Sequence, residues 1–232
     1  MRCSKSVRKT AQNRPDLAFS RTLPAVILGV PLPDSNHGAA LVWRIIRGAM
    51  ADSLDVRTGD RTHHELVAGL DHVRESPREA GTLEMIVGRP AVDERIFLAS
   101  GELDMERGLV ADRWSRGSKP NPKAQLTVMN ARAAQLVAGD RSRWALAGDQ
   151  LYADFDLSPE NIPAGTRLAI GSAVIEVSDQ PHLGCEKFAA RFGQRAREFA
   201  NSSEGTSVSF RGINTRVVQS GTVHVGDAVR KL

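Results

Sequence analysis

The 232-residue sequence predicts a mainly β fold, a barrel or sandwich with a few peripheral helices. Three observations support this fold class. Short segments with the two-residue period of strands recur from about residue 80 onward, and the turns between them are rich in Gly, Pro, Asn and Asp. These segments do not alternate with helical ones, so no βαβ unit is expected. The chain also contains no internal repeat.

The first expected element is a helix over roughly 63–74, where apolar side chains recur with helical spacing. Thr62 or Asp60 can cap its start, and Ser76-Pro77 ends it. The expected strands then span 82–87, 91–99, 125–129, 166–170, 173–177, 207–210, 215–220 and 223–225.

Three helical segments are expected among these strands. A short helix covers 130–136, and a helical turn at 158–161 has Ser158 as its cap. The third is a continuous helix over 187–200, whose apolar stripe consists of Phe188, Phe192, Ala196 and Phe199. The polar segment 112–124 is expected to be a mobile loop inside the domain.

Charge divides the chain into two parts. Residues 1–50 hold eight Lys and Arg against two Asp, whereas the remaining residues hold 23 basic and 25 acidic side chains. We therefore expect 1–50 to be a basic, disordered extension and 51–232 to be a single domain. Because that domain is nearly neutral and only 5% of the residues are aromatic, no nucleic-acid partner is expected.

Cysteine content and hydropathy indicate a cytoplasmic protein. The chain has two cysteines, Cys3 and Cys185, which cannot form a disulfide framework and fit a reducing compartment. The longest apolar run, 23–32, has ten residues including two prolines, which is too short to span a bilayer. No membrane association is expected.

Cys185 is the strongest candidate for chemistry. It follows the strand predicted at 173–177 and precedes the helix predicted at 187–200, so the thiol is expected near a helix N-terminus, where a thiolate is favoured. His182, three residues earlier, can serve as a proton acceptor or donor. Lys187, Arg191 and Arg195 recur every four residues, so they would form one cationic stripe that favours the thiolate or binds an anion. The alternative is a solvated helix face beside a cysteine that merely packs.

Two further segments carry polar side chains that can bind a ligand. The acids and arginines of 102–114 can hold a metal or a polar ligand, or form a solvated loop. The segment 210–214 can place Arg211 and Asn214 beside a ligand, or be a turn and strand without a ligand. The sequence has no CxxC, HExxH, Walker or G-x-S-x-G motif, and His63-His64 lacks a matching Cys/His set for zinc.

Taken in order, several blocks resemble the MOSC domain, the family named for the C-terminal part of molybdenum cofactor sulfurase, in its small stand-alone bacterial form. The resemblance covers roughly 80–232. Its blocks are Gly108–Trp114, Gly148-Asp149 with Asp156–Ser158, Asn161–Gly171, His182–Phe188, Arg211–Asn214 and Gly221–Asp227. Ala111 and Trp114 depart from the Gly and His that are more usual in the first block.

The resemblance implies a β-barrel-like fold and a pocket that contains the cysteine. It also implies a molybdenum cofactor, a molybdopterin, with Cys185 as sulfur carrier or molybdenum ligand. His182 would assist Cys185, while Lys187 and Arg191 would stabilise the thiolate or bind the pterin phosphate. Arg211 and Asn214 would contact the ligand, and Asp112 and Arg113 would shape the rim. The sulfurase's pyridoxal phosphate domain has no counterpart here, so no pyridoxal phosphate chemistry is expected.

Three functions fit these residues. The first is a molybdopterin-dependent oxidoreductase or sulfurtransferase; some relatives reduce N-hydroxylated compounds. The second is a carrier that delivers sulfur or cofactor to a partner enzyme, for which a sulfur donor or a redox protein would be the partner. The third is a peroxide-sensitive thiol without a cofactor.

Overall fold

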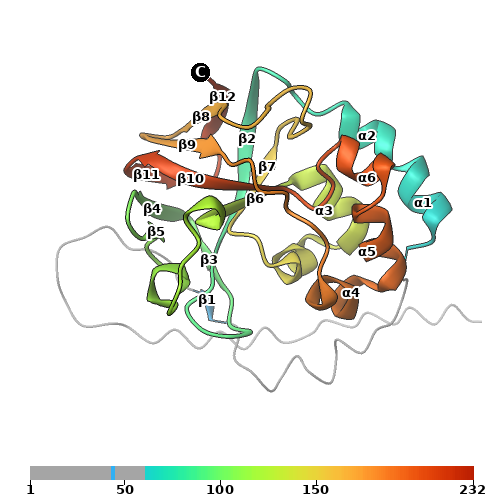
Figure 1. Ribbon diagram of the computed structural model, residues 1–232, viewed down its shortest axis with the longest axis horizontal. Helices are drawn as coiled ribbons and strands as arrows, with labels where there is room; N and C mark the ends of the chain where they lie inside the picture. Colours follow the sequence, from blue (N-terminus) through green and yellow to red (C-terminus); the bar gives the residue numbers. More distant parts are fainter. Residues whose placement is uncertain (1–42, 45–60) are drawn as a thin grey trace, which may run out of the picture. The chain divides into compact units, whose positions relative to one another are not determined.

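A nine-stranded sheet runs through the part of the chain that the structure, a computed structural model, describes: residues 43–44 and 61–232. The strand order is β1-β3-β2-β12-β8-β9-β10-β6-β7, and β2 also pairs with β7. This last pairing closes β2, β12, β8, β9, β10, β6 and β7 into a barrel, to which β3 and β1 are added at β2 (Figure 1). The predicted β-barrel fold is confirmed.

The strands of this sheet are β1 (Trp43–Arg44), β2 (Ala80–Gly88), β3 (Ile96–Leu98), β6 (Leu126–Asn130), β7 (Leu151–Asp154), β8 (Arg167–Ile170), β9 (Ala173–Val177), β10 (Ile213–Gln219) and β12 (Ala228–Lys231). A second sheet has the order β11-β4-β5 and consists of β4 (Ser100–Asp104), β5 (Gly108–Leu109) and β11 (Gly221–His224).

The helices gather on one side of the barrel (Figure 1). They are α1 (His63–Ala68), α2 (Leu70–Arg74), α3 (Ala131–Ala138), α4 (Glu186–Phe192), α5 (Gln194–Ala200) and α6 (Ser203–Ser207), together with the 3-10 helix η3 (Arg141–Ala147). Two further 3-10 helices, η1 (Trp114–Arg116) and η2 (Pro122–Ala124), instead contact the strands β5 and β10. None of the helices in 61–232 is long and apolar enough to cross a membrane.

Strand alternation divides the buried apolar side chains into two cores. On β7, Leu151 and Ala153 belong to one core, whereas Tyr152 between them belongs to the core that contains the helices. On β6, Val128 and Met129 divide in the same way. This follows from the two-residue period of a strand. The barrel is therefore filled by one set of side chains and covered by helices that pack on another.

The strand pair β6–β7 corrects one expectation. These strands are parallel, with Val128 opposite Leu151, and α3 and η3 connect them. A parallel pair needs a crossover connection, so this is a βαβ unit where none was predicted. The sequence did not predict this βαβ unit, because β7 is only four residues long and was not predicted as a strand.

Several predicted elements differ from the structure. The helix expected over 63–74 begins at a Thr62 capping box as predicted, but divides at Gly69 into α1 and α2. The strand expected over 91–99 is limited to β3. The strand expected over 207–210 is wrong: α6 ends there, and a turn follows in which Ser209 has φ of 48°. A positive φ at a non-glycine residue does not fit an extended strand.

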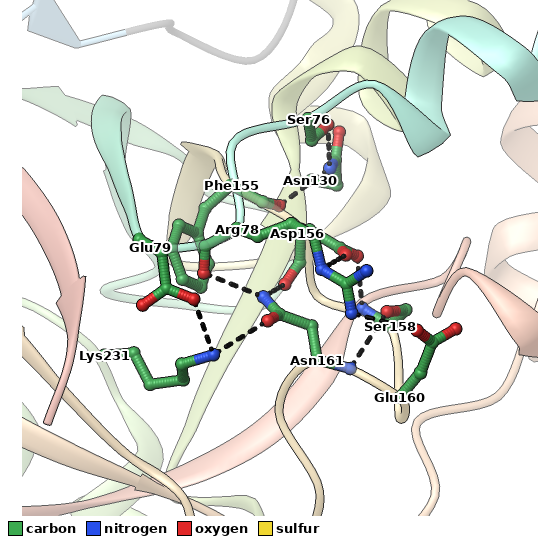
Figure 2. Close-up of polar contacts among 10 residues, drawn as sticks. All are labelled: Ser76, Arg78, Glu79, Asn130, Phe155, Asp156, Ser158, Glu160, Asn161 and Lys231. Carbon is green, nitrogen blue, oxygen red and sulfur yellow. Dashed lines mark hydrogen bonds and ion pairs between the residues drawn. The ribbon is translucent and has the colours of Figure 1, made fainter.

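A network of hydrogen bonds joins the turn at 156–162 to the residues just before β2 and to the last strand, β12 (Figure 2). The buried Asn161 side chain donates from Nδ2 to the carbonyl oxygens of Arg78 and Asp156, at 3.1 and 2.9 Å. Its Oδ1 accepts from Nζ of Lys231 on β12 at 3.0 Å. The predicted cap is present, because Ser158 Oγ accepts from the Asn161 amide at 3.3 Å. This turn forms one wall of the pocket described next.

The expected division into an extension at 1–50 and a domain at 51–232 remains a prediction. Apart from 43–44, residues 1–60 lie outside the described residues.

Candidate functional site

A pocket of about 270 Å³ lies between the turn at 157–164, the loop that follows β9, and the segment 206–214. Its apolar wall includes Leu157, Ile162, Val177, Phe210 and Ile213. Three predicted site residues, His182, Arg211 and Asn214, also line it. They come from parts of the chain about 30 residues apart, and the antiparallel pairing of β9 with β10 brings these segments together.

A buried carboxylate, Asp149, links two of these three residues. Its side chain is fully buried, and Oδ2 accepts from Arg211 Nη1 at 2.6 Å. Oδ1 lies 3.6 Å from Nδ1 of His182. Within the described residues, Asp149 Oδ1, His182 Nδ1 and Arg211 Nε are buried atoms without a hydrogen bond. Removing either member of the buried Asp149–Arg211 pair would be costly, because it would leave the other charge buried without a partner.

The imidazole of His182 is neutral at pH 7. The pKa of His182 is lowered to about 4, mainly by burial and in addition by the neighbouring Arg211 charge, while the Asp149 carboxylate only partly opposes these effects. The imidazolium form is therefore not available as a proton donor at neutral pH. Of the two roles predicted for His182, this leaves that of an acceptor.

Four arginines surround the C-terminal end of η3. Each of the four consecutive carbonyl oxygens of residues 145 to 148 accepts from a different guanidinium, at 3.3, 2.7, 2.9 and 2.5 Å. The donors, in the same order, are Arg95, Arg191, Arg211 and Arg89. We call these four residues the arginine ring. Cations are favoured at a helix C-terminus, where unpaired carbonyls carry partial negative charge.

The arginine ring has more positive charge than its buried carboxylates neutralise. Arg211 pairs with Asp149, and Arg89 pairs with the buried Asp112 at 2.6 Å. Arg191 lies 3.4 Å from the half-exposed Asp93. Arg95 donates to the carbonyls of Ala145 and Glu94, and its pKa is lowered by burial and by the charges of Arg191 and Arg89. An anion bound here would relieve this repulsion.

Cys185 lies at the start of α4 as predicted, but it is not among the residues that line the pocket, although the family resemblance implied a pocket that contains it. It is the N-cap residue, its carbonyl accepts from the amides of Phe188 and Ala189, and its side chain is exposed. Three residues before it, His182 faces Asp149. Three residues after it, the Phe188 ring lies 5.1 Å from the guanidinium of Arg211. The backbone on both sides of Cys185 is therefore held by contacts to the same buried ion pair, while the thiol itself is exposed.

The loop that leads to Cys185 is fixed by two side chains. The amide of Gly184 donates to Oδ1 of Asn201 at 2.7 Å. Nδ2 of Asn214 donates to the carbonyls of Gln180 and Pro181, both at 3.2 Å. Asn214, predicted to contact a ligand, thus positions the loop while it also lines the pocket.

The predicted cationic stripe is not continuous. Gly193 has φ of 88° and ψ of 156°, and it separates α4 from α5. The prediction of one helix over 187–200 is therefore wrong, and Arg195 lies on a different helix from Lys187 and Arg191. Lys187 is exposed, whereas Arg191 joins the arginine ring.

The neighbouring residues Asp112 and Arg113 have different environments. Asp112 is buried, holds Arg89 and accepts from the Trp114 amide at 2.9 Å. Arg113 is exposed, and its backbone amide donates to the carbonyl of Arg89. Asp112 therefore acts on the arginine ring through Arg89.

Sequence reasoning missed Arg89, Arg95 and Asp149 as site residues. Arg89 follows β2 and Arg95 precedes β3, and they lie 59 and 50 residues before the carbonyls that they contact, so no local pattern connects them. Asp149 did carry a signal, because Gly148-Asp149 is one of the blocks that carry the family resemblance. Within residues 43–44 and 61–232, no three His, Cys, Asp or Glu side chains form a group that could hold a metal ion.

Comparison with known proteins gave one family match and several structural ones. The model of the MOSC domain matches residues 123–230. YiiM from Escherichia coli is 21% identical, with a TM-score of 0.45 over 65% of this chain and 69% of that one. The YuaD protein from Bacillus subtilis is 14% identical, with a TM-score of 0.45 over 66% of this chain and 95% of that one. YiiM from Geobacillus stearothermophilus is 15% identical, with a TM-score of 0.46 over 66% and 75%. None of the curated proteins compared with the chain matches it.

Proposed function

This chain is a MOSC domain protein, and from that membership we propose that it binds a molybdenum cofactor and uses Cys185 for molybdenum ligation or sulfur transfer. The observation that carries the proposal is the position of the thiol. Cys185 is exposed, starts a helix, and is flanked by two contacts to the Asp149–Arg211 pair. Soft thiolate sulfur suits both molybdenum and persulfide chemistry.

The residues around this thiol fit an anionic cofactor. The arginine ring has excess positive charge, and guanidinium groups bind phosphate through paired hydrogen bonds. Arg211 Nε and Gln150 Nε2 are buried donors without a partner in the described residues. Because no His, Cys, Asp and Glu group there could hold a metal ion, Cys185 would be the ligand from this chain. When bound, the cofactor supplies two-electron redox chemistry.

Each residue then has a defined task. Arg95 and Arg191 hold the phosphate, while Asp112 keeps Arg89 in place beside them. Asn214 fixes the loop that positions Cys185. His182 lines the pocket as a neutral acceptor. The reaction proposed is reduction of an N-hydroxylated compound or transfer of sulfur.

The alternative proposal is a carrier without turnover. Cys185 thiolate would take the outer sulfur of a donor persulfide, which becomes a thiolate as the new persulfide forms on Cys185. The exposed thiol favours this function, because a partner protein can reach it. Leu183, which is 51% exposed two residues away, adds an apolar contact for such a partner.

Elemental analysis for molybdenum and fluorescence analysis for pterin test the cofactor. The full chain is expressed where molybdopterin is made, and wild type is compared with Cys185→Ser and with the matched control Cys3→Ser. We expect molybdenum in wild type and in Cys3→Ser, and a loss of most of it in Cys185→Ser. No molybdenum in wild type, together with unchanged behaviour of Cys185→Ser, would exclude the cofactor.

Intact-mass analysis distinguishes the carrier from the enzyme. After incubation with a cysteine desulfurase, a carrier gains the mass of one sulfur atom on Cys185, and Cys185→Ser does not. A protein that stays at its original mass but reduces hydroxylamines is the enzyme. A peroxide-sensitive thiol would instead contain no molybdenum, acquire no sulfur, and be oxidised at Cys185 by peroxide.

A further inference from the structure

We infer that Asp149 is a positioning residue that holds His182 in its Nδ1–H tautomer, so that Nε2 accepts a hydrogen bond from an uncharged, largely apolar ligand bearing an O–H or N–H group. The inference deepens the proposed function and rests on it in one respect: the ligand is the substrate of the reaction proposed for Cys185. The assignment of the tautomer rests on the described contacts alone.

The two buried atoms that face each other determine the tautomer. Asp149 Oδ2 is occupied by Arg211, so Oδ1 is the free acceptor, and Nδ1 of His182 is the atom next to it at 3.6 Å. Both atoms are buried without another partner among the described residues. An unprotonated Nδ1 would direct its lone pair at the carboxylate, whereas an Nδ1–H would direct its positive end toward it, an electrostatic attraction at a separation that is longer than a hydrogen bond. A neutral imidazole has one N–H, so that proton belongs on Nδ1.

The same reasoning leaves Nε2 as an acceptor. The His182 side chain is 15% exposed, and Nδ1 contributes none of this exposure. Nε2 is the only other polar atom of the side chain, and no described residue donates to it. Because His182 lines the pocket, a pocket ligand can supply the missing donor. The charged groups around the imidazole are Asp149, Arg211 and Arg89.

The charges around the pocket determine the class of ligand. A cation would meet the repulsion of Arg211 and Arg89, because the carboxylate of Asp149 already pairs with Arg211. An anionic acceptor would face the lone pair of Nε2. The apolar wall formed by Leu157, Ile162 and Phe210 favours a hydrophobic body. A neutral molecule with one hydrogen-bond donor satisfies all three conditions.

Long-range 1H–15N NMR of the full chain at pH 7 tests the tautomer directly. We expect His182 to be Nδ1–H with an unprotonated Nε2. His224 is an internal control, because its Nδ1 also lies 3.6 Å from a carboxylate, that of Asp227, but its side chain is 61% exposed. We expect a mixture of tautomers for His224. An Nε2–H tautomer at His182 in wild type would overturn the inference without any variant.

Asp149→Asn reverses the expected tautomer. Because Arg211 requires an acceptor, the side-chain oxygen of the introduced asparagine would take the place of Oδ2. The side-chain NH2 group of the new residue would then lie next to His182 Nδ1 and act as a donor to it. The imidazole proton then moves to Nε2, as in the protease triad where the same substitution selects the wrong tautomer. An unchanged tautomer in a folded Asp149→Asn protein would contradict the inference. If this variant does not fold, the wild-type spectrum and the ligand comparison below still decide.

Two probes test the ligand class, 4-methylphenol and its methyl ether, 4-methylanisole, which lacks the O–H donor. We expect wild type to bind the phenol roughly 3- to 10-fold more tightly than the ether, the worth of one hydrogen bond, and we expect the phenol to shift the Nε2 resonance. In Asp149→Asn this preference should disappear. Equal affinities in wild type would overturn the ligand class. Neither measurement needs molybdenum. A protein that binds no molybdenum cofactor would be detected by elemental analysis, independently of the results for the tautomer and the two probes.

Discussion

At the scale of single residues, His182 makes the stability of the protein depend on pH. Burial lowers the pKa of His182 to about 4, whereas an imidazole in the unfolded chain titrates near about 6.5. The unfolded state therefore binds more protons between these two values. Stability is complete above about pH 6.5, and roughly 3 kcal/mol is lost as pH falls toward 4.

Urea unfolding at about pH 7 and about pH 4.5 measures this loss. His182→Gln removes the titrating group, so its free energy of unfolding should fall less between the two pH values than that of wild type. An identical fall in both proteins would contradict the assignment of the pKa shift to His182.

The candidate site shows which residues a sequence can reveal. Cys185, His182 and Arg211 belong to short blocks, so their neighbours along the chain identified them. Asp112 was predicted at the rim of the pocket, and it is instead a buried partner of Arg89. Arg89 and Arg95 were missed because their role depends on carbonyl groups, which every residue has and no sequence pattern marks.

At the scale of elements, Gly193 defines the angle between α4 and α5. Its φ of 88° and ψ of 156° lie in a region that only glycine adopts readily. We expect Gly193→Ala to reduce the free energy of unfolding by about 2 kcal/mol and to weaken molybdenum binding, because α4 carries Cys185 and Arg191.

Gly117→Ala is the matched control for Gly193→Ala. Gly117 has an ordinary φ of −70°, so its substitution should change stability by less than about 1 kcal/mol. Urea unfolding of both variants makes the comparison. Equal effects would mean that the backbone conformation of Gly193 is not what stabilises this region.

The helices also show why periodicity predicts faces better than boundaries. Phe188, Phe192, Ala196 and Phe199 are all buried, as their spacing predicted, although the helix they were assigned to is two helices. The apolar face continues across Gly193 because both helices pack on the same core. A break that leaves the buried face intact changes no hydrophobic pattern, so only the glycine could have indicated it.

At the scale of the whole molecule, Asn161 joins the turn at 156–162 to the residues before β2 and to β12 (Figure 2). Asn161→Ala removes the two hydrogen bonds that the side-chain amide donates to backbone carbonyls and the one that its oxygen accepts from Lys231. We expect a loss of roughly 2 to 3 kcal/mol, because buried groups are left without partners.

Glu160→Ala is the control for Asn161→Ala. Glu160 is the preceding residue in the same turn, but its side chain is 80% exposed and pairs with Arg78 at the surface. Its substitution should change the free energy of unfolding by less than about 1 kcal/mol. A smaller loss for Asn161→Ala than for Glu160→Ala would show that the network does not stabilise the fold.

The overall class of the molecule was predictable, but its closure was not. Short alternating segments indicated a barrel, and the two-core arrangement follows from that alternation. The parallel pairing of β6 with β7 and the pairing of β7 with β2 depend on contacts between distant segments. The segment 151–154 is buried on nearly all sides, so it lacks the polar alternation by which a strand is recognised.

The position of β12 has a consequence for biosynthesis. This strand lies between β2 and β8, so residues 228–231 join two neighbours that were made long before them. During translation, the edges of β2 and β8 stay unpaired until these residues leave the ribosome. Pairing of β12 with both neighbours is therefore a step of high contact order, and a chain that lacks residues 228–231 would present two open strand edges to chaperones or to aggregation.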